Sequence, residues 1–503
     1  MSVWCFASVL AIAHASFVSV TSLPGWNGTL PSNWYSGFVD VSPSPLGTKM
    51  FEHYVFIESE NDPANDPVVL WMNGGPGASS MYGLFVEIGP LLLKDDSLQT
   101  DEYRRTGVPT LQYNEFGWTQ FANVLILEFS PPVGFSFCSP PGPAGNGTSC
   151  GAWNDTTTLT ANYKALLGFF KDMPRFVQNP LFLIGESYAG VYTPMLANAI
   201  LDGASTFALN LQGMGVIDGC QGTEVLCGHK PSPLQRGLGP WYDLLFFYGH
   251  AQVSNSHYNA LVKTCGEPAL RNGNLTTACS ALVDNFYSSL GGYYGYNLYD
   301  TCSAGGVFLP GHVKHSGWGR KVPVNPQRRH KGNPLGPVSH TGYECSGSAM
   351  DIWIALPAVR TALGVAVNSN FFDTDNGVGF VYHATFENVL PIYSRLRSAG
   401  IRTATFSADA DPALNTFVLQ DIFFDWWAQE GVAVKEDWRP WALSSNKTES
   451  RFSAGYVQTY NGDFWFATLR GSGHMIPYFM PREAFVLFQT FIAGQSLPQQ
   501  GTK

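Results

Sequence analysis

The stretch LFLIGESYAGVYTPML occupies residues 181–196. Its first four residues are apolar, as in a strand buried on both faces, and the residues from Val191 onward fit a helix. Ser187 lies between them on a turn with small residues on both sides, although Ala189 fills the second small position instead of glycine. Such a turn exposes a serine hydroxyl for nucleophilic attack. The alternative is a strand-to-helix corner with an unused serine, so Ser187 needs partners elsewhere in the chain.

Short apolar runs recur along the chain and alternate with helical stretches. The expected strands are 68–72, 123–127, 181–184, 213–217, 402–406 and 464–469, with a hairpin over 34–57; the expected helices are 157–171, 389–396 and 482–493. Strands that alternate with helices form a mostly parallel sheet with helices on both faces.

A glycine-rich loop follows the expected strand 68–72. It reads NGGPG at residues 73–77, and three glycines in five residues allow backbone N–H groups to point outward. Such a loop can bind an oxyanion. By itself, however, it would be interpreted as a tight turn between a strand and a helix.

Two later strands end in an acid and a histidine. The strand 402–406 leads to Asp409 and Asp411, and the strand 464–469 leads to His474 in a glycine-flanked loop. A serine nucleophile needs a base to remove its proton, and the base needs an acid to orient it. The chain order serine, acid, histidine is that of α/β-hydrolases, so this α/β fold is predicted. Periodicity does not choose between the two aspartates.

Composition limits the kind of protein. The chain has 503 residues, of which 45% are hydrophobic, and its net charge is −10. This composition supports a globular protein with a packed core, in an acidic or extracellular setting. A run of basic residues over 320–331 favours an exposed loop over a nucleic-acid patch, because the whole chain is acidic.

The N-terminus resembles a secretory leader. Residues 1–15 contain a short apolar stretch and end in AHA, which predicts a signal peptide in preference to a buried helix, although a basic n-region is missing. No other segment has the run of about 20 apolar residues that a membrane span needs. Five glycosylation sequons fit this routing: Asn27, Asn146, Asn154, Asn274 and Asn446.

Removal of the leader with Cys5 leaves eight cysteines. Their short intervals favour the pairs Cys138 with Cys150, Cys220 with Cys227, Cys265 with Cys279, and Cys302 with Cys345. A zinc site is the alternative, but no C-x-x-C pattern supports it, and no metal is expected.

From Cys220 onward the alternation of strands and helices is lost. The expected division is therefore a first core part over 22–219, an inserted cap domain over 220–381, and a second core part over 382–503.

Four motifs resemble the serine carboxypeptidase family: WMNGGPG at 71–77, GESYAG at 185–190, the Asp-x-Asp at 409–411, and GHMIP at 473–477. LPG at 23–25, YSGF at 35–38 and NLYD at 297–300 extend the likeness over nearly the whole mature chain. The resemblance implies a peptidase that releases C-terminal amino acids through an acyl-enzyme at acid pH, with no cofactor. It assigns the triad to Ser187, Asp411 and His474, the oxyanion hole to Gly75 and Tyr188, the substrate carboxylate to Asn73, Gly74, Glu87 and Glu186, and the leaving-residue pocket to Tyr82, Val86, Tyr299 and Met475.

Glu87, Glu186 and a bound substrate carboxylate cannot all three be ionised. Like charges in one site raise the pKa of at least one of the groups. We therefore expect KM for peptides to rise above about pH 6. The expected partners are peptide or protein C-termini as substrate, with no nucleic acid and no membrane span; a homodimer is left open.

Two other functions remain open at this stage. A related acyltransferase would pass the acyl group to an alcohol; Glu186 before the nucleophile favours the peptidase, because such transferases tend to carry Asp there. A glycoprotein that protects another enzyme by binding is the second. The resemblance also suggests that the basic loop over 304–344 is excised, and it leaves lysosome, vacuole and secretion as destinations.

Overall fold

The computed structural model describes residues 17–139, 150–227, 239–300, 307–308, 321–322, 348–373, 380–444 and 451–500. Several expectations fall outside these residues: the leader over 1–15, Asn146, Asn446, Cys302, Cys345, and all but four residues of the 304–344 loop.

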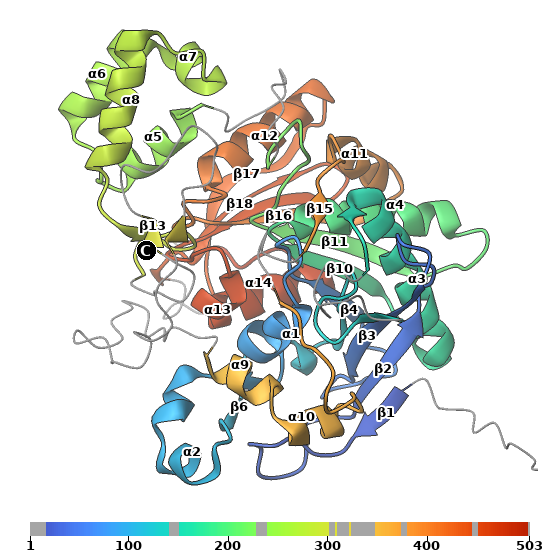
Figure 1. Cartoon of the computed structure of the whole chain (residues 1–503). Helices are drawn as coiled ribbons and strands as arrows, with labels where there is room; N and C mark the ends of the chain where they lie inside the picture. The colour runs from blue at the N-terminus through green and yellow to red at the C-terminus, as the bar shows by residue number, and fades with distance from the viewer. Residues whose placement is uncertain are drawn as a thin grey trace, which may run out of the picture.

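A twisted sheet of twelve strands crosses the molecule (Figure 1). Its order is β1 (Phe17–Val20), β2 (Trp34–Asp40), β3 (Lys49–Ile57), β7 (Asn123–Leu127), β4 (Val68–Met72), β10 (Leu181–Glu186), β11 (Leu211–Ile217), β16 (Arg402–Ala408), β19 (Phe464–Leu469), β18 (Gly455–Tyr460) and β17 (Val434–Trp441), with β8 (Phe137–Ser139) paired to β3. The six strands from β7 to β19 are parallel to one another, and the flanking pairs are antiparallel. All the strands expected from the sequence are present, which confirms the predicted α/β-hydrolase fold.

Successive residues of each central strand enter two different hydrophobic cores. In β4, Leu70 and Met72 join one cluster, while Val69 and Trp71 join the other, and all four side chains are fully buried. Alternation follows from the pleat, because neighbouring side chains of a strand point to opposite faces. Burial on both faces explains why these strands appear in the sequence as continuous apolar runs.

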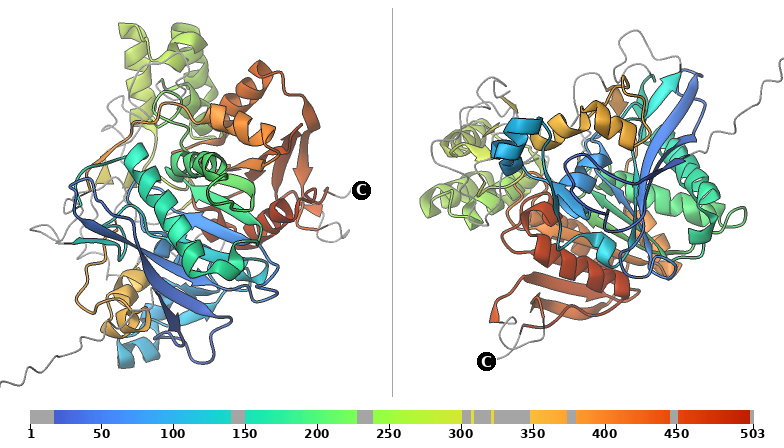
Figure 2. Two further views of the ribbon diagram at one scale, coloured as in Figure 1. Left: turned by 90° about the vertical axis from the view of Figure 1, so that its right-hand side faces the viewer. Right: turned by 90° about the horizontal axis from the view of Figure 1, so that it is seen from below.

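Helices cover both faces of the sheet. One face carries α3 (Asp155–Asp172), α4 (Ala189–Gly203), α11 (Leu390–Ser398) and α12 (Thr416–Gln429); the other carries α14 (Pro481–Ala493), α13 (Ile476–Phe479), the π-helical segment η1 (Gly83–Ile88), the 3₁₀ turn η3 (Trp118–Gln120), α9 (Ser348–Ile354) and α10 (Pro357–Ala362). Figure 2 shows α3 and α4 in green and α14 in red on opposite sides of the strands. The three helices expected from the sequence are confirmed, within about two residues at each end.

The segment expected to form the cap contains two separate helical parts. Helices α5 (Trp241–Gly249), α6 (Asn255–Cys265), α7 (Glu267–Asn272) and α8 (Thr277–Ser289) project beyond the sheet (Figure 1). An ion pair of 2.7 Å from Arg271 to Asp421 ties them to α12. Helices α9 and α10 instead pack against the core, where Trp353 contacts Phe85 with ring centroids 4.6 Å apart. The cap boundaries at 220 and 381 remain a prediction.

Short elements complete the described chain: α1 (Ser80–Tyr82), α2 (Asp101–Thr106), the 3₁₀ turns η2 (Asp95–Gln99) and η4 (Pro174–Phe176), and the small sheets of β5 (Leu91–Leu93) with β6 (Leu111–Tyr113), β9 (Trp153–Asn154) with β15 (Tyr382–His383), and β12 (Tyr293–Tyr294) with β13 (Val307–Phe308) and β14 (Lys321–Val322). None of the described helices combines the length and the apolar character needed to cross a membrane.

Three disulfides join cysteines in the pairs that short intervals favour: Cys138–Cys150, Cys220–Cys227 and Cys265–Cys279. Two of the glycosylation candidates, Asn27 and Asn274, are exposed. Asn154 is half-buried, and its side chain caps α3 by accepting from the Thr157 N–H at 2.9 Å. Modification at these positions remains a prediction.

One buried acid in β3 has no hydrogen-bond partner in the part of the chain that the structure describes. Both carboxyl oxygens of Glu52 lack a hydrogen bond within the described residues, and the side chain is fully buried. Burial, and then the charge of Glu128, raise the pKa of Glu52 well above its usual value. The folded protein therefore holds a proton that the unfolded chain releases above about pH 4.3. The contribution of Glu52 to the free energy of unfolding is therefore fully present below that pH and is lost as the pH rises toward the raised pKa of the folded state.

We therefore expect Glu52→Leu to stabilise the protein by about 1–3 kcal/mol at neutral pH, because leucine removes a buried polar group without a partner. The gain should be smaller near pH 5 than near pH 7. Unfolding midpoints of both proteins across this range provide the measurement. A variant that is less stable than the wild type at both pH values would contradict this interpretation of Glu52.

Candidate active site

Ser187 follows β10 directly and adopts a left-handed backbone conformation with φ of 63°. Its N–H donates to Ile217 O at 2.9 Å, and its carbonyl accepts from the N–H groups of Gly190 and Cys220 at 2.9 and 3.0 Å. Main-chain bonds thus hold the serine on a sharp turn between β10 and α4. This is the geometry expected of a nucleophile on a strand-to-helix elbow, and the side chain is only half-buried.

The small residues around Ser187 are required by close contacts. A Cβ at Gly190 would lie 2.4 Å from Cys220 O, and a Cβ at Gly185 would lie 2.1 Å from Thr193 Oγ1. Ala189 is tolerated but fully buried, and its Cβ would lie 2.9 Å from that of a residue replacing Gly185. The elbow therefore needs glycine on two sides and a side chain no larger than alanine at position 189.

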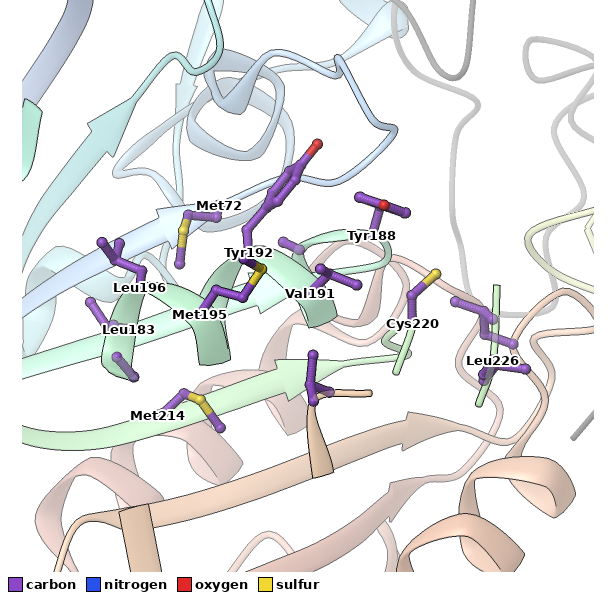
Figure 3. Packing of buried hydrophobic residues seen from close by; sticks show 14 of the residues in the cluster. Met72, Leu183, Tyr188, Val191, Tyr192, Met195, Leu196, Met214, Cys220 and Leu226 are labelled. Atoms are coloured by element: carbon purple, nitrogen blue, oxygen red, sulfur yellow. The ribbon is translucent and has the colours of Figure 1, made fainter. Parts of the chain in front are cut away.

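Helix α4 holds the elbow against the sheet. In Figure 3, Met195 and Leu196 of α4 lie over Leu183 of β10 and Met214 of β11, in one cluster of buried side chains. Tyr188, at the start of the helix, is fixed at its far end, because its hydroxyl donates to the buried carboxylate of Asp155 at 2.8 Å. Tyr188 is thus held at its backbone by the start of α4 and at its hydroxyl by Asp155.

The expected acid and base are in contact. His474 Nδ1 donates to Asp411 Oδ2 at 2.7 Å, and both side chains are at least 96% buried. Asp411 Oδ1 accepts from Ala413 N–H at 2.8 Å. Asp409, the alternative left open by periodicity, accepts instead from Gly471 N–H at 2.6 Å. The structure therefore pairs Asp411 with the histidine.

His474 is also held from its other side. Its backbone N–H donates to Tyr296 O at 2.7 Å, and the Tyr296 ring stacks on the imidazole at 4.8 Å. Within the described residues, His474 Nε2 has no hydrogen-bond partner, so Ser187 Oγ does not donate to it. The structure thus forms the acid–base contact but not the serine–base contact. Catalytic hydrogen bonds are often long or poorly aligned before substrate binds.

The glycine-rich loop lies directly against the elbow. A Cβ at Gly74 would lie 2.4 Å from Tyr188 N and 2.8 Å from the Cβ of Ser187. The next residue, Gly75, has φ of 105°, which favours glycine. In the described part of the chain, no hydrogen bond uses the N–H of Gly75 or of Tyr188. The structure therefore brings two unused backbone donors close to Ser187.

A buried cluster of amide and carboxyl groups adjoins this loop. Asn73 Nδ2 donates to Glu87 Oε1 at 3.1 Å and to Glu186 Oε1 at 3.3 Å. Asn73 is itself fixed by Trp71 Nε1, which donates to its side-chain oxygen at 2.7 Å. The Oε2 atoms of both glutamates are buried without a hydrogen-bond partner among the described residues. Two carboxyl oxygens are thus available for another group.

The two glutamates favour their neutral forms. Burial raises the pKa of Glu87 to about 7, although the Asn73 donor opposes the change. Burial, and then the charge of Glu87, raise the pKa of Glu186 well above its usual value. Since the two carboxyl groups interact, their titration belongs to the pair and not to either glutamate alone. At acid pH the cluster therefore offers O–H donors to an anion.

The residues expected to line a pocket come from several parts of the chain. Tyr82 and Met475 belong to one small cluster with Tyr294 and Phe479. Val86 is buried in the core that packs against α14. Tyr299 is 50% exposed, and its ring lies 5.8 Å from that of His250. The structure thus groups Tyr82 with Met475, and Tyr82 also packs against the core that contains Val86.

Sequence reasoning missed two residues beside the triad. Asp218, at the end of β11, is fully buried; one of its carboxylate oxygens, one of Asp411 and a ring nitrogen of His474 all lie within 4.8 Å of one another. Tyr296 covers His474 from a segment without a motif. The signal for Asp218 was its place directly after a core strand, where the two later aspartates also lie.

Comparisons with known proteins agree with these features. A family model described as serine carboxypeptidase matches residues 24–494. Similar proteins include serine carboxypeptidase 1 of Hordeum vulgare, 29% identical over 498 residues (95% of this chain, 93% of that one), and the lysosomal protective protein of Mus musculus, 32% identical over 492 residues (94% and 93%). The crystal structure of a prohormone-processing carboxypeptidase from Saccharomyces cerevisiae has the same fold, with a TM-score of 0.63 at 17% identity, over 92% of this chain and 91% of that one.

Proposed function

The chain belongs to the serine carboxypeptidase family of hydrolases, and from this premise we propose that it releases C-terminal amino acids from peptides and proteins through an acyl-enzyme at acid pH. One observation carries the proposal. Asn73 joins two buried glutamates in a cradle, and the next residue, Gly74, lies so close to Ser187 and Tyr188 that a side chain there would collide with both. A carboxylate held in the cradle would place the last peptide bond beside the nucleophile.

The first half of the reaction forms the acyl-enzyme. Ser187 Oγ attacks the carbonyl carbon of the last peptide bond while His474 Nε2 takes the hydroxyl proton. Asp411 holds the imidazole by its contact with Nδ1 and stabilises the imidazolium. The N–H groups of Gly75 and Tyr188 stabilise the oxyanion. The proton then passes from His474 to the leaving amino group as the C–N bond breaks.

The second half returns the enzyme to its starting state. Water attacks the acyl carbon, and His474 takes a proton from it. Collapse of the second tetrahedral intermediate breaks the ester bond, and the proton returns to Ser187 Oγ. The amino acid is released in the first half of the reaction and leaves the cradle. The shortened peptide is released in the second half, with a new C-terminal carboxyl group.

The cradle explains why acid pH would favour binding. A substrate carboxylate can accept O–H donors from Glu87 and Glu186 only while at least one of them is protonated. Asn73 Nδ2 and the backbone N–H of Gly74 supply neutral donors beside them. Since the pKa of Glu87 is raised to about 7, we expect KM to rise as the pH passes through this region.

Replacement of both Glu87 and Glu186 by glutamine should remove this rise. Glutamine donates a hydrogen bond at every pH, so we expect the KM of the double variant to vary less than about threefold where that of the wild type rises about tenfold per pH unit. Steady-state kinetics across the pH range test this. Equal slopes in the two proteins would contradict the assignment of the cradle.

The proposed function itself is tested with a blocked dipeptide and its C-terminal amide. The free acid should release its last amino acid, and the amide should react far more slowly, because it has no carboxylate for the cradle. Release from both at equal rates would indicate a different serine hydrolase. No release from any member of a panel of blocked dipeptides, at any pH, would overturn the proposal.

The same acyl-enzyme could transfer its acyl group to an alcohol. A relative from Arabidopsis thaliana, 30% identical, is called serine carboxypeptidase-like 21, a name that does not state its reaction. A glucose ester as donor, with product analysis for transfer against hydrolysis, separates the two reactions. Secretory routing is part of the proposal, supported by the three disulfides and by the lysosomal name of the mouse relative.

A further inference from the structure

Asp218 directly follows β11, the strand that lies between the nucleophile strand and the strand that leads to Asp411. In the sheet, β11 lies between β10, which ends in Glu186, and β16, which leads to Asp411. The backbone N–H of Asp218 donates to Phe406 O at 2.9 Å, and its Oδ1 accepts from Ala408 N–H at 2.9 Å. Asp218 thus binds the end of β16 immediately before the loop that carries Asp411.

Other ionisable groups surround this carboxyl. Asp411 and Asp409 face it from the loop after β16, Glu186 from the end of β10, and His474 from the loop after β19. Oδ2 of Asp218 is buried and has no hydrogen-bond partner among the described residues. Asp218 is therefore an acid that lies among other acids, and none of the ion pairs within the described residues involves it.

We propose that Asp218 is a positioning residue: as a neutral carboxylic acid it clamps the end of β16, fixes the Asp411 loop against His474, and keeps a second negative charge out of the acid–base pair. The inference rests on the proposed function, in which Asp411 orients the base.

Electrostatics supports the neutral form. Burial, and then the charge of Asp411, raise the pKa of Asp218 well above its usual value, while the Ala408 N–H and the Ser407 hydroxyl oppose the change. An ionised Asp218 would favour the imidazolium of His474 and oppose the oxyanion, so the base would be blocked by a proton up to a higher pH. A neutral acid at this place leaves Asp411 as the charged group in contact with the histidine, while Glu87 acts on the histidine without a hydrogen bond to it.

The test compares Asp218→Asn with Asp218→Ala by the rate at which a fluorophosphonate labels Ser187 between about pH 4 and 8. Asparagine has the shape of the neutral acid: its carbonyl oxygen can accept from Ala408 N–H, and its amide can replace the acid O–H. We expect it to label within about threefold of the wild-type rate near pH 5, with the midpoint of the acid limb moved by less than about 0.3 pH unit. Alanine loses the clamp, and we expect labelling at least about tenfold slower at every pH.

Peptide kinetics provide a second readout. Loss of positioning should lower kcat of Asp218→Ala while KM changes less than about twofold, because the cradle residues are intact. Asp243 supplies the matched control. It is a half-buried aspartate in α5, its pKa is raised to about 6 by desolvation, and it accepts from Tyr287 O–H at 2.6 Å. Asp243→Asn and Asp243→Ala should label Ser187 at the wild-type rate.

Three outcomes would overturn the proposal. In Asp218→Asn, a midpoint that falls by more than about one pH unit would show that the aspartate had been ionised, since a charge within 4.8 Å of the histidine is expected to shift it by more than that. A wild-type rate in Asp218→Ala would show that there is no positioning role. Equal losses in the two alanine variants would assign the effect to folding. Labelling does not require the cradle, so failure of peptide release with normal labelling would count against the proposed substrate instead.

Discussion

Replacement of Ser187 by alanine is expected to lower kcat/KM for a blocked dipeptide by about 10⁴-fold to 10⁶-fold, and to abolish labelling by a fluorophosphonate. The hydroxyl is the atom that forms the acyl-enzyme, and no other side chain on the elbow can replace it. The fold should persist, because the bonds that hold the turn to Ile217, Gly190 and Cys220 come from the main chain.

Binding distinguishes this loss from damage to the site. The alanine variant should still bind the dipeptide with the wild-type pH dependence, because the cradle around Asn73 does not use the serine hydroxyl. Ser205→Ala is a suitable control, since Ser205 is an exposed serine just beyond α4, and it should keep wild-type kinetics. Residual peptide release by Ser187→Ala above about 1% of the wild-type rate would require another nucleophile.

Asp411→Asn should lower kcat by about 10⁴-fold. Asp411 Oδ1 accepts from Ala413 N–H and Oδ2 faces His474 Nδ1. If the asparagine oxygen keeps the bond to Ala413, its NH₂ group faces Nδ1, which must then accept. The imidazole proton would move to Nε2, and the histidine could no longer take the proton of Ser187. KM should change little, because Asp411 is not part of the cradle.

Asp409→Asn is the matched control for this variant. Asp409 accepts from Gly471 N–H, which an asparagine oxygen can also do, so we expect a loss below about tenfold. A larger loss in Asp409→Asn than in Asp411→Asn would reverse the assignment of the orienting acid. The comparison decides the alternative that periodicity left open.

The central strands could be predicted because of where they lie. β4 and β10 are buried on both faces, so their sequences are continuous apolar runs with sharp ends. The edge strand β17 was missed, because half of its residues are exposed and it contains Lys435, Glu436 and Asp437. Helix α12 was also missed: Phe424 and Trp426 are apolar on its less buried side, which obscures the amphipathic pattern.

The active-site residues also divide into those that the sequence predicts and those that it does not. Ser187 and His474 were predictable because each lies in a loop of small residues directly after a core strand. Asp218 was not predicted, since its meaning depends on β11 lying between β10 and β16, and a sequence does not state the order of strands in a sheet. The buried Glu52 was also not predicted, because its burial depends on tertiary packing.

The buried carboxylate of Asp155 links parts of the chain that are synthesised at different times. It accepts from Tyr188 O–H in the elbow, from Tyr382 O–H, and from the Phe386 N–H, at 2.7–2.8 Å. The full set of donors to Asp155 is therefore present only after the segment around residue 386 has left the ribosome, and His474 emerges later still. A nascent or prematurely terminated chain would carry the nucleophile without its base, so hydrolytic activity could not begin before translation is nearly complete.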